Sequence, residues 1–244
     1  MNIQIRHTIK GAWALVKGSK RAFFTTFIAM ALLQAALVCI QEEISLLGDK
    51  SNLSSPLITI LMLLITSPLS AGFAMIGLKR ARGESVKWKS GLVYFKKILP
   101  LFSAYFISMM AMWLGVIVIL FVFFHLSQSF IMPHLLNAGF AARFSVLVIF
   151  ALIGLLALSA INTLFSFNPL LILDEKKRFL QAVSKSIKLA WAHFKKLYGL
   201  VIILLCLNIL GAIPFGLGLI WTIPLTYISI GLAYEKIRVK APTL

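Results

Sequence analysis

Six long segments without a single formal charge restrict the fold of this chain more than any other feature. A helix that crosses a bilayer core about 30 Å thick needs about 20 predominantly apolar residues. The six segments contain no Asp, Glu, Lys or Arg, and they are residues 22–40, 56–78, 101–126, 144–173, 197–213 and 214–234. We predict an all-α integral membrane protein in which these segments are six transmembrane helices of a single polytopic domain, residues 1–244.

The composition argues against the other fold classes that apolar runs would allow. Charged residues make up 13% of the chain, about half the share found in soluble domains, so six buried helices would have too little polar surface around them. The strands of a β-barrel alternate apolar and polar residues, whereas these runs are continuous. Basic residues precede the first run and no A-x-A pattern closes it, so we expect a retained anchor rather than a signal peptide.

The basic residues alternate between the connecting segments and predict an orientation. All but Lys50 and Arg143 of the 24 Lys and Arg residues lie in the N-terminal tail, the second and fourth loops and the C-terminal tail. Segments rich in Lys and Arg face the cytoplasm. We therefore expect a multi-pass plasma-membrane protein with both termini cytoplasmic. Pro214 cannot continue the fifth helix, so the fifth and sixth spans should form a tight hairpin with its turn on the opposite face.

A basic phrase that contains tryptophan occurs twice, each time before a long apolar run. Residues 9–17, IKGAWALVK, and residues 187–195, IKLAWAHFK, are identical at six of nine positions. On a helix, each phrase has an apolar face with i, i+3, i+4 and i+7 spacing and a basic opposite side. The two apolar faces comprise Ile5, Ile9, Ala12, Trp13 and Val16 in residues 3–20, and Val183, Ile187, Ala190, Trp191 and Phe194 in residues 179–197.

Basic helices of this kind, with tryptophan at the apolar boundary, lie in the plane of the lipid headgroups. A third, weaker copy, VKWKSGLVYFKKIL at residues 86–99, precedes the third span. We therefore predict three cytoplasmic amphipathic interfacial helices on anionic lipid, where each Lys near the surface contributes about 1 kcal/mol. The residues expected to contact the membrane surface are Trp13, Lys17, Lys96, Lys97, Lys188, Trp191, Lys195 and Lys196.

The second, fourth and sixth spans each contain a Pro-Leu pair, beginning at Pro68, Pro169 and Pro224. An interfacial helix, an outward span and an inward span thus repeat three times, at about residues 1–80, 84–174 and 179–238. Parallel repeats are related by an axis along the membrane normal, so we predict a six-helix bundle with approximate three-fold symmetry and a cytoplasmic collar. The alternative is convergent patterning, because any cytoplasmic helix beside a span tends to be basic and aromatic.

No residue pattern predicts catalysis, and neither a cofactor nor a metal is expected. The chain has no Walker loop, dinucleotide fingerprint, G-x-S-x-G motif or H-E-x-x-H motif. The acidic pair Asp174-Glu175, at the end of the fourth span, is expected to cap the N-terminus of the helix that follows and to form salt bridges. Cys39 and Cys206 lie inside apolar runs and are expected to be inert buried thiols.

The intramembrane polar residues leave two interpretations open. Ion-coupled carriers usually place ionisable groups within the membrane, and no Asp, Glu, Lys or Arg occurs inside the six segments. Asn162, Ser166 and Asn208 are expected to form hydrogen bonds across helices. The alternative is that they line a polar or lipid path along the axis of the bundle.

The C-terminal part of the chain resembles a known family. The segment FNPLLILDEKKRFLQAVSKSIKLAWAHFKKL, followed by IPFGLGLIWTIPLTYISIGLAYEKI, is similar to uncharacterised six-span bacterial inner-membrane proteins. These are loosely related to the membrane domain attached to some glycerophosphodiester phosphodiesterases. The resemblance covers the chain from Phe167 onward and the rest only in layout; it depends on Pro169, Asp174, Ala182, Ser186, Pro214, Gly216, Gly218, Pro224 and Tyr234. It implies residence in a bacterial inner membrane and no established activity.

Together these patterns predict a non-enzymatic component of the cell inner membrane that organises lipid or a partner protein. The expected partners are a bilayer with anionic lipids and a membrane protein. The net charge of +17 could also suggest nucleic acid, but the apolar runs make an anionic membrane surface the better partner. The alternative function is a small transporter or channel for an apolar or amphipathic solute.

Overall fold

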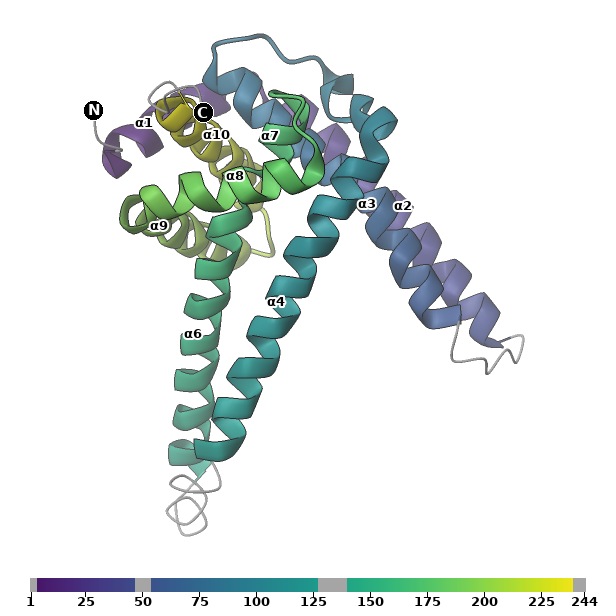
Figure 1. Ribbon diagram of the computed structural model, residues 1–244, viewed down its shortest axis with the longest axis vertical. Coiled ribbons are helices and arrows are strands. Elements are labelled where there is room, and N and C mark those ends of the chain that lie inside the picture. The colour runs from purple at the N-terminus through teal and green to yellow at the C-terminus, as the bar shows by residue number, and fades with distance from the viewer. Residues whose placement is uncertain (1–3, 47–53, 127–139, 239–244) are drawn as a thin grey trace.

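Helices form the part of the chain that the computed structural model describes, residues 4–46, 54–126 and 140–238 (Figure 1). No strand occurs in these ranges, so the all-α class is confirmed there. The longer helices are α2 (Lys20–Leu46), α3 (Ser54–Ala81), α4 (Ile98–Leu126), α6 (Phe140–Phe165), α9 (Phe194–Ala212) and α10 (Leu219–Arg238). The shorter ones are α1 (Ile5–Val16), α7 (Asn168–Leu173), α8 (Phe179–Ala192) and the 3-10 helices η1 (Trp88–Gly91) and η2 (Val93–Lys97).

Five segments in the described ranges are long and apolar enough to cross a membrane: Lys20–Glu43, Ile58–Ala81, Trp88–His125, Phe144–Leu173 and Phe194–Ala212. They correspond to the first five predicted spans, and by length and composition this chain is a multi-pass membrane protein. The sixth predicted span, residues 214–234, is not among them. Helix α10 begins only at Leu219 and carries Lys236 and Arg238 in its last turn, which leaves too short an apolar stretch.

The packed core lies at one end of the molecule, in a region that we call the hub. The hub comprises α1, α7, α8, α10 and the adjoining ends of α2, α3, α4 and α9, whose buried apolar side chains form one cluster. From the hub the α2–α3 pair and the α4–α6 pair extend in different directions (Figure 1). Trp113, Ile117 and Phe121 on α4 are more than half exposed. The predicted six-helix bundle is therefore wrong, because the two pairs diverge and present their apolar side chains outward.

The contacts within the hub follow a cyclic order, while the predicted three-fold repeat itself stays a prediction. Helix α1 packs against α10, the 3-10 helices against α3, and α8 against α7. Each surface segment thus contacts the Pro-Leu helix of the preceding unit, with the first unit contacting the last. The leucines of the three pairs, Leu69, Leu170 and Leu225, are all buried.

The fourth predicted span is broken near its end. Helix α6 stops at Phe165 and α7 begins at Asn168, because Pro169 has no amide hydrogen and its ring blocks the preceding turn. Ser186 of α8 compensates for the break. Its Oγ donates to the carbonyl of Leu164 at 2.7 Å and accepts from the amide of Phe167 at 3.3 Å. The break therefore depends on a side chain from a different element.

The turn between α9 and α10 lies beside the start of α2. Lys20 Nζ is 4.5 Å from the ring centroid of Trp221, and Phe215 and Gly216 line a groove together with Lys20 and Phe27. Helix α2 is about 40 Å long, so the turn is far from the other end of that helix. The predicted position of this turn, on the opposite face from the N-terminal tail, is therefore wrong.

The position of this turn makes a first testable prediction. Spin labels at Arg21→Cys and Leu217→Cys, with Cys39 and Cys206 replaced by Ser, should lie within about 20 Å, because both flank the contact between Lys20 and Trp221. Opposite membrane faces would separate them by about 30 Å or more. Pulsed electron paramagnetic resonance in nanodiscs measures the distance. A second variant keeps the native Cys39 and carries Arg21→Cys as its other label site; these two positions are about 27 Å apart along α2 and serve as the reference distance. A test-pair distance longer than this reference would contradict the structure.

Candidate functional site

The two tryptophans of the repeated phrase lie on the surface of the hub. Ala12 and Ala190, at matching positions of the two copies, are fully buried, whereas the adjacent Trp13 and Trp191 are 56% and 68% exposed. The apolar faces of α1 and α8 therefore pack against protein along the alanine edge. The tryptophans stand at the outer edge, where they are available to a membrane surface.

The six lysines predicted to contact the membrane surface lie in four different local structures. Lys17 follows α1, Lys188 is on α8, Lys195 and Lys196 begin α9, and Lys96 and Lys97 end η2. None of them forms a salt bridge within the described ranges. All are exposed except the half-buried Lys196.

Two of the predicted interfacial helices differ from expectation. Residues 86–99 are not an amphipathic α-helix, because η1 and η2 are separate 3-10 helices with Gly91 packed against Thr26 of α2. The helix predicted at residues 179–197 ends at Ala192, where His193 leaves the helical region with φ −122° and ψ 20°. Trp191 and Lys195 are therefore on different helices.

An ion-pair cluster joins the ends of three helices in the hub. Arg82, which follows α3, binds Asp174 with two hydrogen bonds of 2.7 Å and also contacts Glu235 of α10. Arg238 donates to the same aspartate at 3.2 Å. The hydrogen bonds to Asp174 raise the pKa of Arg82 above its ordinary value, so the guanidinium stays charged. The bidentate geometry is the strong form of this pair.

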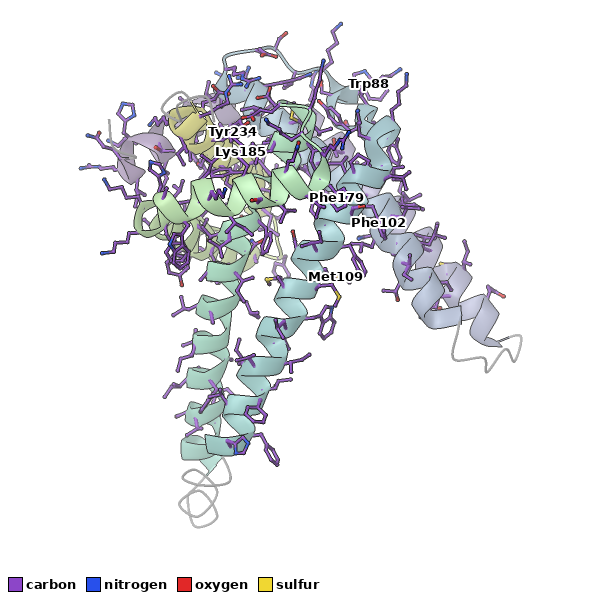
Figure 2. The ribbon with its side chains drawn as sticks, viewed as in Figure 1. Trp88, Phe102, Met109, Phe179, Lys185 and Tyr234 are labelled. Carbon is purple, nitrogen blue, oxygen red and sulfur yellow. The ribbon has the colours of Figure 1, made fainter. Side chains whose placement is uncertain are left out.

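Glu175 extends the cluster to α8 and α10. Its two carboxylate oxygens accept from Lys185 Nζ at 2.5 Å and from the Tyr234 hydroxyl at 3.1 Å. Lys185 and Tyr234 lie close together in the hub in Figure 2. The predicted salt bridging of Asp174 and Glu175 is confirmed. Helix capping by Asp174 takes the form of a C-terminal cap of α7, not the expected N-terminal cap.

The sequence pattern does not predict the partners of these carboxylates. Arg82, Glu235 and Arg238 are far from Asp174 in the chain, and only the fold brings them together. The scarcity of acids is the signal that could have found them. The chain has only seven Asp and Glu residues, so three of them at helix ends that share a membrane face should find basic partners.

The cluster is suited to holding helices together. Every carboxylate in it accepts from a cation or a hydroxyl at 3.2 Å or less. Within the described ranges, no group of three or more His, Cys, Asp or Glu side chains could hold a metal ion.

The intramembrane polar residues differ in exposure and in hydrogen-bond partners. Asn162 is exposed on α6, and Ser166 donates to the carbonyl of Thr163 in its own helix. Asn208 donates to Thr226 across α9 and α10 at 2.9 Å, which confirms an interhelical bond for this residue alone. A second bond of this kind joins Asn168 to Ser108 at 3.1 Å. Cys39 and Cys206 are exposed on α2 and α9, so the prediction of buried thiols is wrong.

A groove of about 320 Å³ lies between α2 and the start of α10. Its lining is almost entirely apolar and aromatic, with Lys20 as the charged residue among Phe23, Phe24, Phe27, Phe73, Phe215, Gly216, Leu219, Ile220, Ile223 and Pro224. We call it the α2–α10 groove. Neither the hydropathy pattern nor the repeat predicted it, because it forms only where the turn after α9 meets α2.

Comparisons with family models, with curated proteins and with solved structures found no match. The resemblance to bacterial six-span inner-membrane proteins therefore stays a prediction. The class that the fold defines is a multi-pass α-helical membrane protein, with a packed, ion-paired hub from which apolar helix pairs extend.

Proposed function

We propose that this chain is a non-enzymatic component of a bacterial inner membrane that binds anionic lipid through the hub. One observation carries this proposal: α1 and α8 of the hub expose Trp13 and Trp191, and the exposed Lys17 and Lys188 on or next to the same helices form no salt bridge in the described ranges. Tryptophan favours the membrane–water interface and lysine favours anionic headgroups. In this proposal the hub faces the cytoplasm, with both chain ends on that side.

Two further features support a binding role without catalysis. The hub carboxylates form ion pairs with Arg82, Lys185 and Arg238, an arrangement that joins helix ends. Trp88 on η1 is 54% exposed and Lys89 Nζ lies 4.7 Å from its ring centroid, which adds a third exposed tryptophan, with a lysine beside it, to the surface. A transport path along a bundle axis is less well supported, because Asn162 is exposed on α6 while Ser166 and Asn208 bond to different partners.

A lipid-binding experiment tests this function. Replacing Lys17, Lys188, Lys195 and Lys196 by Glu should lower the amount of phosphatidylglycerol retained by the detergent-purified protein, because each Lys contributes up to about 1 kcal/mol near an anionic surface. Native mass spectrometry counts the retained lipids, and added salt should weaken the binding of the unaltered protein.

The control is the matched variant in which the same four lysines become Arg, which keeps the charge. That variant should retain as much phosphatidylglycerol as the unaltered protein. Equal retention by the Glu variant, in a protein that stays monodisperse, would contradict the proposed function.

A further inference from the structure

We propose that the α2–α10 groove is a site for one anionic phospholipid, with an acyl chain in the groove and the phosphate on Lys20 Nζ. This inference rests on the proposed membrane placement of the hub and adds a discrete site to the general lipid affinity of its surface. The groove combines an apolar floor with a cation at its end, which is the chemistry of an anionic lipid and not of a free phosphate.

The shape of the groove favours an acyl chain. Phe23, Phe24 and Phe27 lie within the first two turns of α2, and Ile220 and Ile223 line the groove from α10. These residues begin at Lys20 and continue about 10 Å along α2, so the groove runs from the charged end of the helix into its apolar part.

Lys20 is placed to bind a phosphate. Its Nζ lies over the Trp221 ring at 4.5 Å and makes no salt bridge in the part of the chain that the structure describes. The neighbouring guanidinium of Arg80 is already occupied, because it donates to the carbonyls of Leu15 and Lys17. Lys20 is therefore the cation of the groove that can pair with an incoming anion.

Phe215 supports the membrane setting of the groove. Its side chain is fully exposed and its φ is +51°, a left-handed conformation that costs a non-glycine residue energy. In water, no contact of the exposed phenyl ring would offset the energy cost of this backbone conformation. Beside an acyl chain, the ring covers apolar surface of the lipid.

Tryptophan fluorescence tests the site directly. The chain has five tryptophans, so replacing Trp13, Trp88, Trp113 and Trp191 by Phe leaves Trp221 as the only reporter. In nanodiscs of unbrominated phosphatidylcholine, phosphatidylglycerol with brominated acyl chains should quench Trp221 at low mole fraction. Brominated phosphatidylcholine should need about fivefold more lipid for the same quenching, the factor that corresponds to about 1 kcal/mol for one Lys.

The substitution Lys20→Gln should remove the preference for phosphatidylglycerol at Trp221, whereas Lys10→Gln, the same charge change on the exposed side of α1, should preserve it. Equal quenching by the two lipids, no quenching by either, or equal loss in both variants would overturn the site. Such a result would leave the proposed function standing as long as native mass spectrometry still counts retained phosphatidylglycerol that depends on Lys17, Lys188, Lys195 and Lys196.

Discussion

Replacing Asp174 by Asn is expected to destabilise the hub by about 2 kcal/mol. The aspartate side chain is only 12% exposed and holds Arg82 by two hydrogen bonds and Arg238 by a third. Removing one partner of a fully buried ion pair costs about 3–5 kcal/mol, and an exposed pair contributes at most about 1 kcal/mol. The 25% exposure of the Arg82 side chain places this pair between the two limits.

The apparent melting temperature of the protein in detergent measures this effect. A loss of about 2 kcal/mol should lower it by roughly 4–8 °C for a chain of this size. The matched control is Glu84→Gln, which makes the same charge change at an exposed residue close to Arg82 that has no salt bridge within the described ranges. The control should lie within about 0.5 kcal/mol of the unaltered protein.

A double-mutant cycle separates the ion pair from general effects of the substitution. Arg82→Gln alone should destabilise the protein by a similar amount, because it leaves Asp174 and Glu235 without their shared partner. The double variant should lose less than the sum of the two single variants, by at least about 0.5 kcal/mol. Additive losses would show that the cluster does not act as a unit.

The hydropathy pattern could predict the apolar helices because it depends only on neighbouring residues. A helix that crosses a bilayer must satisfy every backbone group internally, so a long apolar run has few alternatives to being helical. The same pattern could not predict the tilt of the helices, because the length of an apolar segment shows that it can cross the bilayer but does not set its tilt angle. The direction of α10 depends on its close packing with α3 and on the contact between Lys20 and Trp221, both of which join distant parts of the chain.

Helical periodicity located the surface segments but not their orientation. Ala12 and Trp13 are 100° apart on a helix, so both belong to the predicted apolar face. The structure buries the alanine against protein and leaves the tryptophan outside, because a small side chain permits close contact between α1 and the hub. A sequence pattern cannot distinguish a face that meets lipid from one that meets another helix, since both are apolar.

The three Pro-Leu pairs show a similar limit. Pro68 lies inside a continuous α3 and Pro224 inside a continuous α10, whereas Pro169 lies in the first turn of a separate helix, α7. The local sequences are alike, but only the break before Pro169 is bridged by a serine from another helix, Ser186. Tertiary partners of this kind decide whether a proline ends a membrane helix.

Replacing Gly77 by a larger residue is expected to separate α3 from α10 and to destabilise the hub strongly. A Cβ atom at Gly77 would overlap the backbone carbonyl of Tyr227, and one at Gly231 would lie 2.9 Å from the carbonyl oxygen of Gly77. Backbone atoms cannot move aside as a flexible side chain does, so even Gly77→Ala should cost about 3 kcal/mol. Gly77→Leu should prevent the two helices from packing.

The matched control is Gly154→Ala in α6, where the added Cβ would lie 3.7 Å from Ile119, an ordinary contact. That variant should be as stable as the unaltered protein or slightly more so, because alanine favours a helix over glycine. The melting temperature in detergent distinguishes the two. The distribution of distances between spin labels at positions 21 and 217 should also broaden in Gly77→Ala, because the position of α10 determines where the preceding turn lies relative to α2. If Gly77→Ala had the same melting temperature as Gly154→Ala and an unchanged distance between the labels at positions 21 and 217, the close packing of α3 on α10 would be refuted.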